Sequence, residues 1–84
     1  MIIRTPREIG LLVRDQRRAK GLTQAELAER AGSSREWIRF LESGKQSLEL
    51  GLTLRALSAL GIALDANIEN ADPGAPRKTG KKLK

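Results

Sequence analysis

Hydrophobic residues recur at helical spacing through most of the chain, and start and stop signals divide the pattern into short segments. The first stripe, at positions i, i+3 and i+4, consists of Ile9, Leu12 and Val13. Thr5 and Glu8 precede this stripe as a capping box around Pro6. Gly21 follows it as a residue that can end the helix in a left-handed backbone conformation. The pattern therefore predicts a helix between Thr5 and Gly21, with Arg14, Arg17, Arg18 and Lys20 on its other sides.

Two shorter amphipathic segments follow, separated by a tight joint at Gly32. The first opens at Thr23 in a second capping-box pattern, and its predicted buried residues are Leu27, Ala28 and Ala31. The second opens at Ser33 or Ser34, with Ser33 and Glu36 as a further capping box, and it runs to about residue 43. Two such helices around a glycine-containing turn form a helix-turn-helix pattern, whose second helix can enter the major groove of DNA.

The period of the pattern changes near the end of the chain. A fourth helix is expected over residues 48–60, with Ser47 as its cap and a core face of Leu50, Leu54, Leu57 and Leu60. Beyond Gly61, apolar residues alternate with other residues at period 2, which is typical of a half-buried strand; they are Ile62, Leu64, Ala66 and Ile68. A lone strand leaves an edge unpaired, so we expect it to pair with its copy in a homodimer. A frayed turn or a short fifth helix is the alternative.

Composition narrows the function classes. The 84 residues include no Cys and no His, which leaves no disulfide and no ordinary zinc ligand set, and an enzyme is not expected. No apolar run approaches a membrane span, and no signal peptide is evident, so we expect a cytoplasmic protein without metal or cofactor. Residues 1–69 are expected to fold as one domain. Residues 70–84 are expected to form a disordered basic tail, either a DNA-binding arm or a solubilising end.

Charge is balanced in the folded part, so the distribution of individual side chains matters more than the net value of +6. In the third helix, Ile38 and Leu41 define the buried direction, whereas Glu36, Arg39 and Phe40 point away from it and Arg35 lies at the flank. Arg can bind guanine and Glu can accept from cytosine. The sequence therefore predicts a DNA-binding surface, with phosphate contacts from loops and helix ends. Its residues are Gln24, Ser34, Arg35, Glu36, Trp37, Arg39, Phe40, Ser43 and Lys45.

Three of these assignments have alternatives. Glu36 could instead complete the capping box with Ser33. Trp37 is expected to pack against a neighbouring helix. Phe40 could contact a thymine methyl group or sugar, dock a partner protein, or pack against the loop near Lys45.

The stretches LTQAELA, AGSS and LESG, together with ALGI near the end, resemble the Cro/C1-type, or xenobiotic-response-element, helix-turn-helix family. The resemblance covers about residues 7–65 and implies a small all-α, lambda-repressor-like bundle of four helices that binds DNA as a dimer. It places base contacts at Ser34, Arg35 and Glu36, less uniformly at Trp37 and Phe40, and a phosphate contact at Gln24. The chain departs from the family at Ser33, where an apolar residue is usual, and at Trp37, where a small residue is usual.

The opening RTPREIGLLVRDQRRAKGLTQ, the segment 47–61 and the ending IALDANI resemble HipB-type antitoxins. That narrower resemblance implies a dimer that binds a palindromic operator, represses its own operon and holds a HipA-like kinase toxin, with C-terminal strands paired across the dimer. Two other functions remain open. One is a stand-alone repressor without a toxin, and the other is an interaction module that has lost DNA binding.

Overall fold

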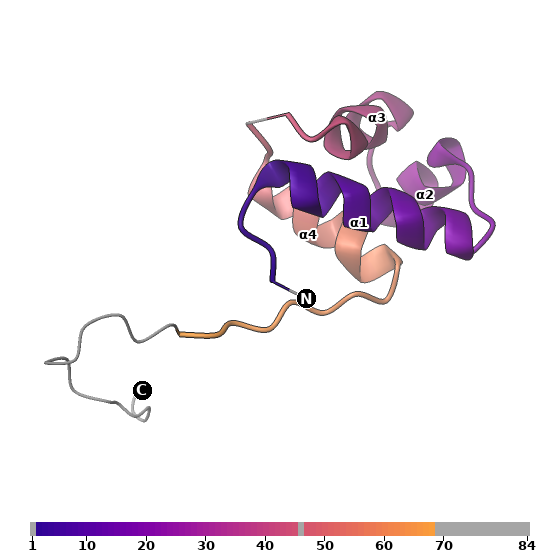
Figure 1. Ribbon diagram of the computed structural model, residues 1–84. Coiled ribbons are helices and arrows are strands. Elements are labelled where there is room, and N and C mark those ends of the chain that lie inside the picture. Colours follow the sequence, from indigo (N-terminus) through magenta and orange to yellow (C-terminus); the bar gives the residue numbers. More distant parts are fainter. Residues whose placement is uncertain (1, 46, 69–84) are drawn as a thin grey trace, which may run out of the picture.

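The computed structural model describes residues 2–45 and 47–68, which form four helices packed around one core (Figure 1). The helices are α1 (Pro6–Ala19), α2 (Gln24–Ala31), α3 (Arg35–Ser43) and α4 (Leu50–Ala59). None of the described residues lies in a strand. The predicted all-α bundle of four helices is therefore confirmed, whereas the basic tail predicted for residues 70–84 lies outside the described residues.

The starts of α1 and α2 follow the sequence signals closely. The Thr5 hydroxyl accepts a hydrogen bond from the Glu8 amide at 3.2 Å, and the Glu8 carboxylate accepts one from the Thr5 amide at 2.9 Å. Thr23 and Glu26 repeat this reciprocal pair at 3.0 and 2.8 Å. Each box satisfies amide donors that a helix start leaves without intrahelical acceptors. Both predicted capping boxes are confirmed.

The start of α3 agrees with the second of its two predicted starts, Ser34, and not with Ser33. Gly32 adopts a left-handed conformation (φ 67°), and the Ser33 amide donates back to the Ala28 carbonyl at 2.9 Å, so Ser33 belongs to the closing turn of α2. Ser34 is the N-cap instead, and its hydroxyl accepts from the Trp37 amide at 3.0 Å. The predicted capping box between Ser33 and Glu36 is therefore wrong, and the Glu36 side chain is exposed.

Helix α4 starts later and is rotated relative to the prediction. Glu49, not Ser47, caps it by accepting from the Leu52 amide at 2.6 Å. Leu50 and Leu54 are 68% and 44% exposed, so their predicted place in the core is wrong. Leu57 and Leu60 are buried as predicted, and Thr53 and Ala56 complete the buried face. Thr53 tolerates burial because its hydroxyl donates to the Glu49 carbonyl at 2.7 Å.

The core joins α1 to α3, α2 to α3 and α2 to α4. Its buried hydrophobic residues are Val13, Leu22, Leu27, Ala28, Ala31, Ile38, Leu41, Ala56, Leu57 and Leu60. Gly10 lets α1 approach α3 closely, because a Cβ atom added there would lie 2.6 Å from the Leu41 carbonyl oxygen. Helix α3 is thus held in the bundle by its contacts with both α1 and α2.

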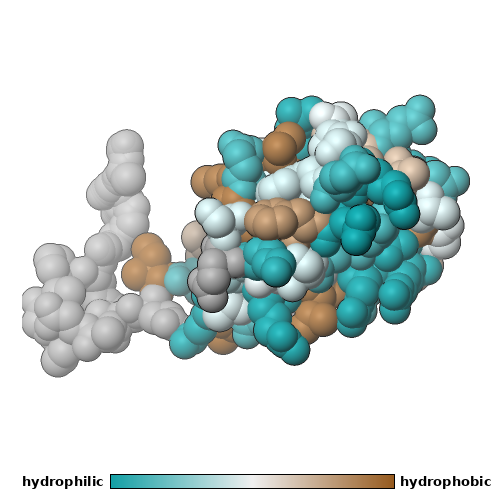
Figure 2. Space-filling view, turned by 90° about the horizontal axis from the view of Figure 1, so that it is seen from above, coloured by the Kyte–Doolittle hydropathy of each residue, from teal (hydrophilic) through white to brown (hydrophobic). Residues whose placement is uncertain are grey.

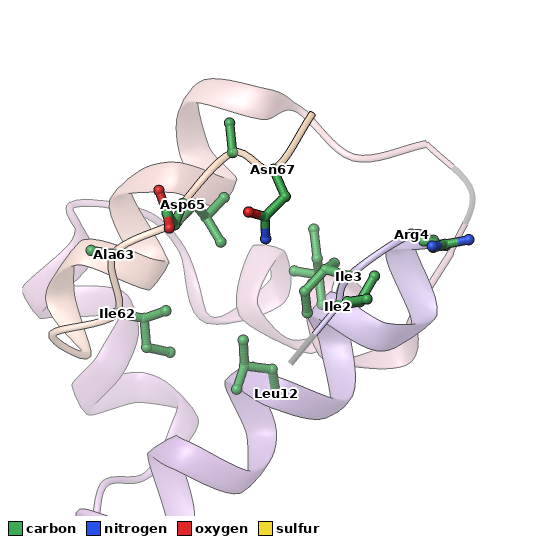
Figure 3. A pocket seen from close by; sticks show the side chains of 11 residues that line it. Ile2, Ile3, Arg4, Leu12, Ile62, Ala63, Asp65 and Asn67 are labelled. Carbon is green, nitrogen blue, oxygen red and sulfur yellow. The ribbon is translucent and has the colours of Figure 1, made fainter. Parts of the chain in front are cut away.

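After Gly61 the chain leaves the bundle in an extended course (Figure 1). Ile62 still packs against the core, whereas Leu64 and Ile68 are 52% and 94% exposed. This segment, residues 2–4 and α1 border a groove of about 850 Å³ (Figure 3). Because the described part of the chain gives residues 62–68 no strand partner, the predicted strand pairing between two copies stays a prediction.

Candidate nucleic-acid interface

The outward face of α3 carries the polar residues that the sequence predicted. Ile38 and Leu41 are fully buried and fix the inward direction of the helix. Arg35, Glu36 and Arg39 are exposed on its other sides. Figure 2 shows the side of the molecule on which α3 lies, where hydrophilic residues surround smaller hydrophobic patches. The turn between α2 and α3 spans residues 32–34, which matches the short glycine-containing joint of a helix-turn-helix.

A buried ion pair fixes the position of α3. Arg17 on α1 donates to the Glu42 carboxylate from Nε at 2.6 Å and from Nη2 at 3.0 Å. Its third donor, Nη1, bonds the Leu22 carbonyl at 2.7 Å. The Arg17 and Glu42 side chains are only 10% and 5% exposed, and the hydrogen bond that Arg17 donates to the Glu42 carboxylate raises the pKa of Arg17. A bidentate pair of this kind sets both distance and orientation between two helices.

Sequence analysis missed the role of Arg17 by grouping it with the exposed basic residues of α1. One signal was present, because Arg17 lies four residues after Val13 on the buried stripe of α1. An arginine at such a position is buried only when its charge is paired. The acidic partner could not be identified from spacing, since Glu42 lies in a different helix.

Gln24 belongs to the same network. Its side-chain amide donates to Glu42 Oε1 at 3.1 Å, so the head of α2 is tied to the end of α3. An amide nitrogen carries two hydrogens, and the second remains suited to a phosphate oxygen. The structure thus places Gln24 beside α3, as a phosphate contact at the rim of the interface requires.

The two ends of α3 present the remaining polar candidates. Ser34 is exposed at the N-terminal end, where its oxygen caps the helix. Ser43 lies at the C-terminal end, but its hydroxyl proton is directed to the Phe40 carbonyl at 2.6 Å. A phosphate contact from Ser43 therefore requires that this bond be exchanged. Lys45 is exposed directly beyond Gly44.

Arg7 is a further basic residue that sequence analysis did not place at the interface. A Cβ atom added to Gly44 would lie 2.8 Å from the Arg7 Cα atom, so the start of α1 abuts the loop after α3. Arg7 is exposed, as is the neighbouring Lys45. The fold thus gathers two cations at the C-terminal end of α3 that lie far apart in the sequence.

The two aromatic residues of α3 contact each other. Trp37 is half-buried and packs against the core, which confirms the packing role expected for it. The rings of Trp37 and Phe40 lie with their centroids 5.6 Å apart at an interplanar angle of 31°. Phe40 is also half-buried, but it is not among the hydrophobic residues that pack against the core.

The described residues contain no group of three or more His, Cys, Asp or Glu side chains that could hold a metal ion. Within the same part of the chain, each helix is too short or too polar to cross a membrane.

Comparisons with known proteins agree with this geometry. A family model described as a helix-turn-helix domain matches residues 8–71. The uncharacterized HTH-type transcriptional regulator y4mF of Sinorhizobium fredii is 41% identical over 76 residues, which cover 90% of this chain and 95% of that protein. An uncharacterized HTH-type transcriptional regulator of Methanothermobacter thermautotrophicus is 50% identical over 50 residues, covering 60% of this chain and 72% of the relative.

Solved structures share the fold. A chain of a HipA-HipB-O2-O3 complex matches with a TM-score of 0.75 at 22% identity, covering 81% of this chain and 96% of that chain. The restriction-modification controller protein C.AhdI from Aeromonas hydrophila matches with a TM-score of 0.62 at 33% identity, covering 69% of this chain and 84% of that chain. The four-helix arrangement, the family match and the relatives agree: the chain belongs to the helix-turn-helix domain family of transcriptional regulators.

Proposed function

We propose that this protein is a sequence-specific transcriptional repressor that places α3 in the major groove of operator DNA. The observation that carries the proposal is the outward face of α3, which presents Arg35, Glu36 and Arg39 to solvent while the Arg17–Glu42 pair fixes its back to α1. A helix locked in this way can present its side chains to base edges without first being ordered. Operator DNA as the target would place the protein with the nucleoid in the cytoplasm.

Each residue of the interface has a role that follows from its chemistry. Arg35, near the N-terminal end of α3, would bond guanine O6 and N7, and Glu36 would accept from a cytosine amino group. Arg39 extends the polar face by one turn. Ser34 would contact a base at the N-terminal end of α3, whereas Gln24, Ser43 and Lys45 would contact phosphate oxygens around the groove, which fixes the register of the helix. Trp37, which packs against the core, would support the groove-facing surface from its inner side.

The proposed repressor is a homodimer. Leu64 and Ile68 expose apolar side chains, and the groove beside them is lined by apolar residues that include Ile3, Ile9 and Leu12. An extended apolar segment beside such a groove favours pairing with a second copy, through Ile62, Leu64, Ala66 and Ile68. A two-fold dimer would present two α3 helices to the two halves of a palindromic operator.

We further propose that the repressor is the antitoxin of a HipBA-like operon, which it autoregulates while binding a kinase toxin of the HipA type. The likeness in fold to a chain of the HipA-HipB-O2-O3 complex and to a chain of a HipB-O4 20mer complex, the latter with a TM-score of 0.72 over 86% of this chain, supports this assignment. A stand-alone regulator is the second candidate, and the 33% identity to the C.AhdI controller favours it.

The DNA-binding proposal is tested with the full chain and a pool of random duplexes. Recovery of a palindromic site bound in gel-shift titration supports it, and Arg35→Ala should weaken that binding by about 1–3 kcal/mol and relax one base position. Failure to enrich any sequence would contradict it. The antitoxin assignment has a separate test: copurification from the native operon should recover a kinase-like protein, whereas recovery of DNA alone supports the stand-alone regulator.

A further inference from the structure

Phe40 occupies the middle of the outward face of α3, although it is apolar. Glu36, Phe40 and Ser43 follow one another at i, i+4 and i+7, on the side of the helix opposite the fully buried Ile38 and Leu41. Phe40 does not belong to the core or to the residues packed against it. Core packing therefore does not account for this side chain.

Trp37 holds the Phe40 ring in place. The two rings are in contact at a centroid distance of 5.6 Å, and Trp37 is itself packed against the core. The ring of Phe40 thus rests on a support that is continuous with the interior of the bundle. A side chain fixed in this way loses little conformational freedom when it binds, which suits a recognition contact.

The surroundings of Phe40 indicate nucleic acid as the occupant of this face. Arg35, Arg39 and Lys45 are exposed on α3 and in the loop after it, as a polyanion requires. The edges of the bases present one apolar group in the major groove, the 5-methyl group of thymine. An apolar ring within a cationic, polar face therefore matches one specific feature of DNA.

We propose that Phe40 contacts the 5-methyl group of a thymine in each operator half-site, with Trp37 as its positioning residue. This inference rests on the proposed DNA-binding function and adds a base preference to it. Phe40 lies five residues after Arg35, which is about 7.5 Å along the helix axis. At roughly 3.4 Å per base step, the thymine should lie about two base pairs from the one that Arg35 contacts. A 5-methylcytosine at that place presents the same methyl group and should be bound in the same way.

The test uses the full chain and the duplex that it selects from a random pool. Each thymine of the site is replaced singly by uracil, which removes only the 5-methyl group, and affinity is measured by fluorescence anisotropy. We expect one thymine per half-site whose replacement weakens binding about three- to fivefold, the effect of one buried methyl group. Phe40→Ala should bind the thymine and uracil duplexes equally, and Phe40→Leu should retain part of the difference.

Two controls separate this contact from a general loss of binding. Arg39→Ala should bind more weakly but keep the sensitivity to uracil, and Ser58→Ala, exposed on α4, should leave affinity and sensitivity unchanged. A circular-dichroism melt checks that Phe40→Ala is folded. If that variant binds no duplex, Phe40→Leu decides the test, because its ratio of affinity for the thymine duplex to affinity for the uracil duplex should be smaller than that of the unaltered chain. The inference is overturned, with DNA binding intact, if a site is enriched but the unaltered chain and both Phe40 variants lose the same affinity at each uracil replacement. A pool without enrichment overturns the proposed function itself. Loss of a copurifying protein in Phe40→Ala, without any uracil-sensitive thymine, overturns the DNA contact in favour of a protein partner.

Discussion

Arg17 and Glu42 form a bidentate ion pair across the bundle, with Nε–Oε2 and Nη2–Oε1 distances of 2.6 and 3.0 Å. The pair joins the last turn of α1 to the last turn of α3, and Gln24 extends it to the first turn of α2. Three helices thus meet at one nearly buried carboxylate. The orientation of α3, and with it the surface proposed to face DNA, therefore depends on this carboxylate.

Breaking this pair should destabilise the fold strongly. Removing one partner leaves a buried charge without its counter-ion, so Glu42→Leu and Arg17→Met should each lower the free energy of unfolding by about 3–5 kcal/mol. The double variant Arg17→Met/Glu42→Leu should lose less than the sum of the single losses, because no buried charge remains. Urea titrations of the variants measure this coupling. Additive losses would show that the pair is not coupled.

Sequence could predict those elements of the fold whose signals are local. Thr5 and Thr23 cap helices because each has a glutamate three residues later, and Gly32 marks a turn that needs a left-handed residue. Residues of the outward face of α3, such as Arg35, could be placed because Ile38 and Leu41 define the helix's buried side within its own sequence.

The remaining features depend on contacts between segments that are distant in sequence. Leucines occur on two sides of α4, so periodicity alone could not decide that Thr53 rather than Leu50 faces the core. The partner of Arg17 and the approach of Arg7 to Gly44 arise from the packing of α1 against α3. No pattern within a single helix carries that information.

Gly10 should be intolerant of a side chain. A Cβ atom there would lie 2.6 and 3.0 Å from the carbonyl oxygens of Leu41 and Glu42, so Gly10→Ala must push α1 away from α3. We expect a loss of about 1–3 kcal/mol in thermal or urea unfolding, despite the better helix propensity of Ala. Gly51→Ala is the matched control, since its Cβ would meet Glu49 oxygens only at 3.4 and 3.5 Å. This control should be neutral or more stable by up to about 1 kcal/mol, and equal behaviour of the two variants would contradict the close approach.

Ser33 and Ser34 should respond in opposite ways to the same substitution. The Ser33 hydroxyl is buried without a hydrogen-bond partner among the described residues, so Ser33→Ala should stabilise the fold by about 1 kcal/mol. Ser34 caps α3, so Ser34→Ala should destabilise it by about 0.5–2 kcal/mol. Differential scanning calorimetry compares the two melting temperatures directly. A lower melting temperature for Ser33→Ala would show that its hydroxyl is satisfied in solution.

The capping-box glutamates predict a loss of stability in acid. The backbone amide of Arg4 lowers the pKa of Glu8, and that of Thr23 lowers the pKa of Glu26, both from an ordinary value of 4.5. Because these pKa values are lower in the folded state, the stabilisation is present above the ordinary value and is lost as the pH falls through the folded values. The variant Glu8→Gln/Glu26→Gln should therefore show a flatter decline of stability below the ordinary value, measured by urea unfolding at a series of pH values. Glu29→Gln, exposed on α2 outside both boxes, should keep the steep decline.

The alternation after Gly61 predicts which substitutions break a dimer. If residues 62–68 pair as strands between two copies, Leu64 points to the apolar side together with Ile62, Ala66 and Ile68, since successive side chains alternate. Leu64→Lys should raise the dimer dissociation constant at least about tenfold, because a charge would have to be buried beside apolar residues such as Leu12. Ser58→Lys adds the same charge on the exposed side of α4, away from the groove, and should leave the constant nearly unchanged. Sedimentation velocity over a concentration series measures both, and a chain truncated after Gly61 should sediment as a monomer. Equal effects of the two lysines would contradict an interface at residues 62–68, and a dimer that survives truncation would place the interface elsewhere on the bundle.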